Sequence, residues 1–172
     1  MADFSKAIEI ILFFEGDFSN DRYDRGGKTR FGITELVARA HGYKGDMETL
    51  PLDIAKAIYK QDYWDALNLD KVFDQAVATE IFDIAVNMGT GYAGRVIQMA
   101  LNYLNRNGEN WEDLKIDGII GDKTLEVVNG LPPHDQPYLM KIINGLQFER
   151  YVHIIRNDPR QEIFFRGWLK RV

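Results

Sequence analysis

A glutamate at the end of an apolar helical pattern is the residue of this sequence best placed for acid–base chemistry. Three apolar residues precede Glu15 at the spacing of one helix face, namely Ile8, Ile11 and Leu12. Gly16 is a typical helix C-cap, so Glu15 is expected in the last turn, where the helix dipole disfavours negative charge. We expect both effects to raise the pKa of Glu15, so that its carboxyl group can act as a general acid. The alternative is a helix-end glutamate turned to solvent.

The elements that would position Glu15 are mostly helices. Residues 17–34 are rich in Asp, Asn, Gly and Arg and predict a loop with a small β-hairpin. The predicted fold class is mainly α, a helical bundle with a small β-hairpin near residues 17–34. Apolar residues recur at three- and four-residue spacing along six stretches, which predicts helices at Phe4–Phe14, Leu52–Tyr63, Val72–Val86, Tyr92–Leu104, Tyr138–Ile155 and Ile163–Leu169.

Composition argues against several classes of function. The chain has 172 residues, a formal net charge of −5, three histidines far apart and no cysteine. Interspersed charges leave no basic stripe for a phosphate backbone, and the lack of clustered ligands argues against a metal site, so we expect neither nucleic acid nor metal. The apolar run Ile8–Phe14 is short and carries Glu9, which fits neither a signal peptide nor a membrane span. We therefore expect synthesis in the cytoplasm without membrane insertion.

The segment that begins at Glu15 contains three motif-like stretches: residues 15–21 (EGDFSND), 24–29 (DRGGKT) and 31–34 (FGIT). In order and spacing these stretches resemble glycoside hydrolase family 108, a family of muramidases that includes secretion activators. The sequence departs from the family where Asp17-Phe18 replaces Gly-Tyr and where Arg22-Tyr23 replaces a common Asp-Pro step. Glu15 matches the glutamate that the family uses as its catalytic residue. The resemblance implies a lysozyme-like α+β fold.

Asp24 is the candidate for a second catalytic carboxylate. Asp24 follows Glu15 by nine positions, and a threonine in a glycine-containing hairpin comes after it, which resembles the arrangement of phage-type lysozymes. Asp24 could order water or stabilise an oxocarbenium-like state, but aspartates in such a segment also cap turns. Thr29 and Thr34 could hydrogen-bond water or sugar, although threonine in a short strand commonly has a structural role.

Two further motifs of the family supply candidate substrate-binding residues. Tyr63 and Trp64 resemble its Tyr-Trp element and could line a sugar subsite, or they could be core aromatics of an amphipathic helix. Asp83 and Asn87 belong to a stretch that resembles its Asp-x-x-Val-Asn-x-Gly element, and they share a helix face with Glu80 one turn earlier. This polar strip could face a saccharide, or Asn87 could cap the helix.

The second half of the chain resembles the peptidoglycan-binding-like domain that accompanies the family. The likeness is clearest in residues 116–125 (IDGIIGDKTL) and 166–171 (RGWLKR), although the first of these also reads as a turn followed by a helix start. We expect a lysozyme-like catalytic region at 1–91 and a helical peptidoglycan-binding-like region at 92–172, packed together as one compact unit.

The resemblance implies an enzyme that hydrolyses the β-1,4 bond between N-acetylmuramic acid and N-acetylglucosamine in peptidoglycan glycan strands. Glu15 would protonate the leaving oxygen, and no cofactor would be required. One alternative is a lytic transglycosylase in which Glu15 acts as acid and then base; another is a non-catalytic cell-wall-binding or secretion-helper protein. A wall substrate would be reached by lysis, as for a prophage endolysin, or through a holin-like or other export partner.

Overall fold

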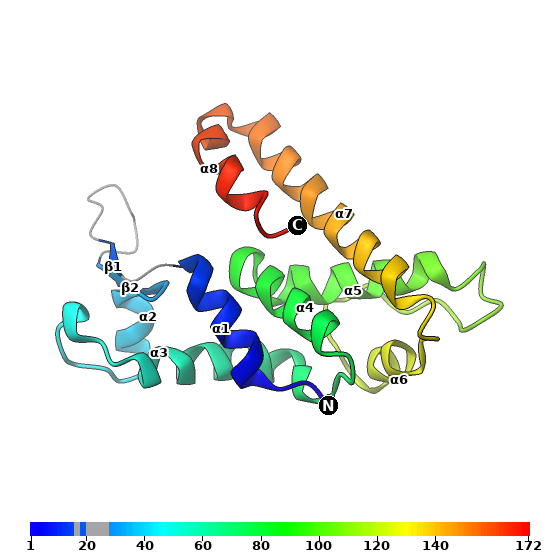
Figure 1. The fold of residues 1–172 in the computed structure, drawn as a ribbon, viewed down its shortest axis with the longest axis horizontal. Coiled ribbons are helices and arrows are strands. Elements are labelled where there is room, and N and C mark those ends of the chain that lie inside the picture. The colour runs from blue at the N-terminus through cyan, green and yellow to red at the C-terminus, as the bar shows by residue number, and fades with distance from the viewer. Residues whose placement is uncertain (16–17, 20–27) are drawn as a thin grey trace.

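The computed structural model describes residues 1–15, 18–19 and 28–172, and for residues 14, 15, 18 and 19 it describes the backbone. This part of the chain holds eight α-helices and three short strands, so the predicted mainly α fold is confirmed (Figure 1). No described helix is both long and apolar enough to cross a membrane. The helices are α1 (Phe4–Glu15), α2 (Glu35–Ala40), α3 (Leu52–Tyr59), α4 (Gln75–Met88), α5 (Thr90–Leu104), α6 (Asp122–Gly130), α7 (Gln136–Asn157) and α8 (Glu162–Trp168).

Short irregular turns connect several of these helices. A π-helical turn, η2 (Lys60–Trp64), continues α3, so the helix predicted to reach Tyr63 changes its hydrogen-bond pattern after Tyr59. Four 3₁₀ turns complete the connections: η1 (Met47–Thr49), η3 (Asp65–Leu67), η4 (Leu69–Lys71) and η5 (Pro159–Gln161).

The predicted β-hairpin is confirmed as part of a small antiparallel sheet with strand order β1-β2-β3. Thr29 pairs with Thr34 across β2 and β3, and the two-residue turn between these strands has positive φ at Phe31 (52°) and Gly32 (75°). The Tyr59 hydroxyl donates a hydrogen bond of 2.9 Å to the Phe31 carbonyl, which ties this turn to α3. The strands are β1 (Phe18–Ser19), β2 (Thr29–Arg30) and β3 (Ile33–Thr34).

Hydrogen bonds connect the N-terminal ends of α1 and α4. The Asp3 carboxylate accepts a hydrogen bond of 2.8 Å from the Ser5 backbone N–H, and the Asp3 N–H donates to Gln75 Oε1 at 2.7 Å. The Asp74 side chain accepts from the Val77 N–H at 2.9 Å, which starts α4 at Gln75 rather than at the predicted Val72. Two helices therefore begin side by side, and α4 supports α1 from its first turn.

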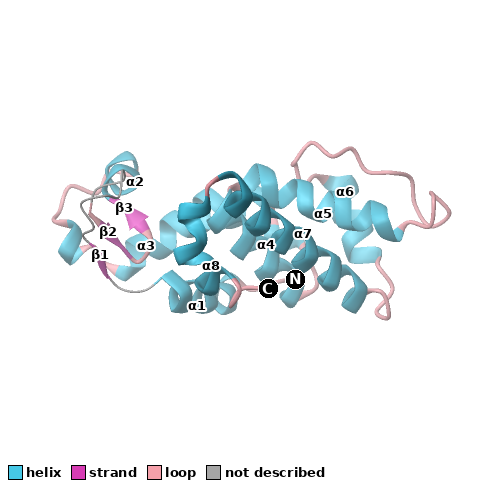
Figure 2. Ribbon diagram, turned by 90° about the horizontal axis from the view of Figure 1, so that it is seen from above, coloured by secondary structure: helices cyan, strands magenta, loops and turns pink. Residues whose placement is uncertain are grey.

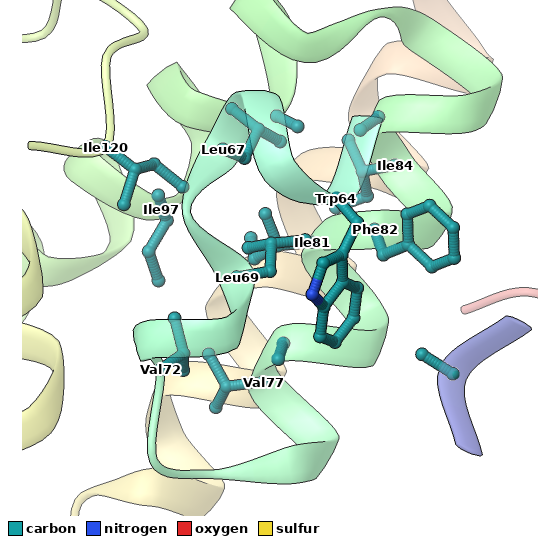
Figure 3. Packing of buried hydrophobic residues seen from close by; sticks show 14 of the residues in the cluster. Trp64, Leu67, Leu69, Val72, Val77, Ile81, Phe82, Ile84, Ile97 and Ile120 are labelled. Atoms are coloured by element: carbon teal, nitrogen blue, oxygen red, sulfur yellow. The ribbon is translucent and has the colours of Figure 1, made fainter. Parts of the chain in front are cut away.

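One apolar core joins the two halves of the chain. The Trp64 ring meets the rings of Phe4 and Phe82 edge to face, with centroid distances of 5.7 Å to Phe4 and 5.5 Å to Phe82. Figure 3 shows Trp64 and Phe82 together in this core, close to Ile81 and Ile84 of α4. The same buried cluster continues through α5 to Leu139 and Ile143 of α7, and so it includes residues on both sides of residue 91.

Glycines allow two close contacts around α5. Gly89 has φ 88° and ends α4, which lets α5 fold back against α4. A Cβ atom at Gly94 would collide with the backbone of Gly118, so α5 lies directly against the loop before α6. The buried Gln98 side chain fixes this loop, because its Oε1 accepts from the Gly118 N–H at 2.8 Å and its Nε2 donates to Asp117 at 3.0 Å.

Candidate functional site

The apolar face predicted to lead to Glu15 is present in α1. Ile8 and Ile11 are 1% and 0% exposed, Leu12 packs against the core, and the helix ends at Glu15. The side chain of Glu15 lies outside the described part of the structure, as does the whole of Asp24. The acid role of Glu15 and the second-carboxylate role of Asp24 remain predictions.

The two candidate threonines face one another in the sheet. Thr34 is the N-cap of α2, where its hydroxyl accepts a hydrogen bond of 3.4 Å from the Val37 N–H. Thr29 lies directly opposite in β2. Thr34 therefore has the structural role that was the alternative to sugar binding. Contact between Thr29 and a sugar stays a prediction.

The predicted aromatic pair divides between core and periphery. Trp64 is 1% exposed, and a ring enclosed by Phe4 and Phe82 offers no face to a sugar. Trp64 is therefore a core aromatic residue, which was the alternative interpretation, and the assignment of Trp64 to a sugar subsite is corrected. Tyr63 is half-buried, with its ring centroid 5.8 Å from that of Tyr59, and its contact with substrate stays a prediction.

Asp83 belongs to a buried polar cluster rather than to a strip open to solvent. Its side chain is 5% exposed, and it forms an ion pair with the Arg171 guanidinium near the C-terminus. Gln147 Nε2 of α7 donates to Asp83 Oδ2 at 3.2 Å, and Asn87 Nδ2 donates to the Asp83 carbonyl at 2.9 Å. The expectation that Asp83 faces a saccharide is corrected, because these partners occupy its carboxylate; Asn87 remains exposed.

Two more titratable groups complete this polar cluster. Burial raises the pKa of Glu80 to about 7, and the nearby Asp83 carboxylate adds to the rise. Within the described part of the chain, Glu80 Oε1 is buried and accepts no hydrogen bond. Burial also raises the pKa of Tyr151 to about 12, and its hydroxyl accepts a 3.2 Å hydrogen bond from Gln147. The cluster thus favours neutral forms of Glu80 and Tyr151 around one buried ion pair.

Helix α8 is held in place by stacked rings and by the Asp83–Arg171 pair. The Trp168 ring stacks on Tyr151 of α7, with centroids 5.1 Å apart and planes 18° apart. At the other end of α8, the turn from α7 is capped by the Asp158 carboxylate, which accepts from the Arg160 N–H at 3.3 Å. These contacts bring α8 to the side of the molecule where α1 ends (Figures 1 and 2).

A surface depression of about 520 Å³ lies where the end of α1 meets α8 and the chain terminus. Other depressions of similar volume occur elsewhere on the described surface, but this one includes Phe13, in the last turn of α1. Its volume falls within the range of about 300–1,000 Å³ typical of small-molecule sites. Its lining includes Phe13, Asn87, Phe164, Trp168, Lys170 and Arg171.

Comparisons with known proteins identify both halves of the chain. Residues 8–89 match the family model described as glycosyl hydrolase 108. The chain carries a glycosyl hydrolase 108 domain. Residues 92–172 match a second model, described as a predicted peptidoglycan domain. No curated protein sequence matches the chain.

Solved structures share the fold of this chain. A structure of Brucella abortus SagA superposes with a TM-score of 0.70 at 23% sequence identity, and the match covers 98% of this chain and 88% of that one. At this identity the match shows a common fold. Because the match covers 98% of this chain, the common fold includes both matched segments.

The buried polar cluster joins the glycosyl hydrolase 108 domain to the peptidoglycan domain. Glu80 and Asp83 lie in the first, whereas Gln147, Tyr151 and Arg171 lie in the second. The last three were not identified from sequence. A signal existed in α7, where Gln147 and Tyr151 continue at four-residue spacing the buried positions Leu139 and Ile143.

Proposed function

We propose that this protein is an N-acetylmuramidase that hydrolyses the β-1,4 bond between N-acetylmuramic acid and N-acetylglucosamine. Glu15 acts as the general acid and protonates the leaving oxygen, while Asp24 or another polar group of residues 17–34 orders the attacking water. The glycosyl hydrolase 108 domain supplies the reaction class, and the peptidoglycan domain supplies the substrate class. The site of action is the cell wall, which the protein reaches by lysis or export.

The position of Glu15 is the observation that carries the proposal. It ends α1 seven residues after Ile8 and four after Ile11, and both of these residues are buried. Residues at these spacings share a helix face, so the spacing places position 15 on the face of α1 that carries these two buried residues. The helix dipole at this end also disfavours a carboxylate, which helps to keep an acid protonated until the glycosidic oxygen takes its proton.

A comparison of Glu15→Gln with wild type tests the proposal. Purified peptidoglycan is digested, clearing of the suspension is followed, and the products are analysed by mass spectrometry. Loss of a general acid lowers kcat by about 10²–10⁴-fold. Glu9→Gln is a matched control on the same helix, because Glu9 is exposed and pairs with Lys56 at 3.2 Å; it should digest the wall at the wild-type rate.

The products separate the alternatives. Hydrolysis leaves reducing N-acetylmuramic acid ends, whereas a lytic transglycosylase leaves 1,6-anhydro ends; the second result would replace the hydrolase assignment. If wild type and Glu15→Gln bind the wall but clear it equally slowly, the protein is a wall-binding protein without the proposed activity.

A further inference from the structure

We propose that the depression between the end of α1 and α8 is a glycan subsite that binds an N-acetylated amino sugar carrying a carboxylate, such as a muramic acid unit. This inference rests on the proposed function and assigns part of its substrate site to the C-terminal segment. On this view the peptidoglycan domain contributes a substrate-binding surface beside the end of α1, in place of a separate anchoring site.

Aromatic side chains give the depression faces that suit sugar rings. Phe164 of α8 is 52% exposed and lies 6.3 Å from Trp168 at an interplanar angle of 26°. Trp168 in turn stacks on the buried Tyr151, so this platform is fixed to α7. Phe13, on the α1 side, is 83% exposed. Rigid aromatic faces next to polar groups are the usual composition of a carbohydrate-sized pocket.

Charge favours an anionic sugar over a neutral one. Lys170 is exposed at the depression although the chain as a whole has a net charge of −5. A muramic acid unit carries a lactyl carboxylate, or a peptide that ends in one, and an ammonium group at the rim attracts it. Arg171 already pairs with Asp83, so it fixes the chain terminus and leaves Lys170 to meet the ligand.

The depression also lies beside the last turn of α1, the turn in which the helix ends at Glu15. Phe13 precedes Glu15 by two residues, so the two positions are about 3 Å apart along the axis of α1, but they project from different faces of the helix. A sugar that contacts Phe13 and the exposed Asn87 is therefore adjacent to the end of α1. The subsite would bind a ring near the scissile bond and set its position for proton transfer.

Binding measured in the Glu15→Gln protein tests the subsite without turnover. The probes are an oligosaccharide of alternating N-acetylglucosamine and N-acetylmuramic acid with free lactyl groups, and an uncharged oligosaccharide of N-acetylglucosamine. Phe164→Ala should weaken binding of both probes about tenfold. Lys170→Ala should weaken only the muramic probe, by a few-fold that shrinks as salt is added.

Controls separate local loss from misfolding. Phe73→Ala removes an equally exposed aromatic, 61% exposed, just before the opposite end of α4, and should bind both probes as the parent does. Phe164→Tyr keeps the ring and should restore binding. Parent-like affinities in both Phe164→Ala and Lys170→Ala would overturn the subsite even if Glu15 proves catalytic. Full hydrolysis by Glu15→Gln would overturn the proposed function, while the binding comparison would still decide on the subsite.

Discussion

Replacing Glu80 with glutamine should stabilise the protein above neutral pH and leave its stability almost unchanged in acid. Burial and the Asp83 carboxylate raise the pKa of Glu80 from 4.5 to about 7. Because the folded protein binds this proton more tightly than the unfolded chain, stability is full below pH 4.5 and falls as the pH rises through 7. Each pKa unit corresponds to about 1.4 kcal/mol, so the shift costs up to about 3 kcal/mol at pH 8.

Glutamine has the shape of glutamate but cannot ionise, so Glu80→Gln should recover about 1–3 kcal/mol at pH 8. Urea unfolding at pH 4.5, 6 and 8, followed by circular dichroism, gives the free energy of unfolding of variant and wild type. Glu126→Gln, on the exposed face of α6, is the control and should give a difference near zero at each pH. A Glu80→Gln protein that is no more stable than wild type at pH 8 would refute the argument that this carboxyl group is held neutral by burial.

Three other substitutions test contacts that position the site. Arg171→Ala should cost about 3 kcal/mol of unfolding free energy in urea because it leaves the Asp83 carboxylate buried without its counter-charge, and adding Asp83→Asn should recover part of the loss. Gly94→Ala should lower the melting temperature sharply or prevent folding, whereas Gly145→Ala in open space on α7 should stabilise by about 0.5–1 kcal/mol. Thr34→Ala should cost about 1 kcal/mol through loss of a helix cap, and a rise in KM beyond that of an equally destabilised control would instead place Thr34 on the sugar.

The helices with long apolar periodicity could be predicted from sequence because burial of one face leaves a regular signal. α7 and α5 end within two residues of their predicted limits. Two elements gave weaker signals: α2 has six residues and a single buried position, Ala38, and α6 was expected only as a helix start near Gly121. The π-helical turn after Tyr59 depends on packing around Trp64, which no local preference encodes.

The candidate site could be predicted from sequence only where its residues are close in the chain. The helical spacing before Glu15 correctly predicted the buried face of α1. The four-residue spacing of Asp83 and Asn87 brings the Asn87 side chain to the Asp83 carbonyl, but it did not predict that Asp83 is buried. The other partners of Asp83 come from α7 and the chain terminus. Asp83 and Arg171 are 88 residues apart, and a single sequence has no signal that pairs them.

The same long-range contacts support the proposed contribution of the second half of the chain to the site. If the peptidoglycan domain only attached the protein to the cell wall, its interface with the hydrolase domain could be small and polar, because attachment does not require a fixed orientation of the two domains. Instead, the interface between the two domains contains a buried ion pair, and removing one partner would leave an uncompensated buried charge. It also contains Glu80, whose ionisation lowers the stability of the folded protein. Such groups fix one relative placement of α4, α7 and α8 at a cost in stability. That placement sets Phe164 and Lys170 across from the last turn of α1, which is what a cleft built from both halves requires.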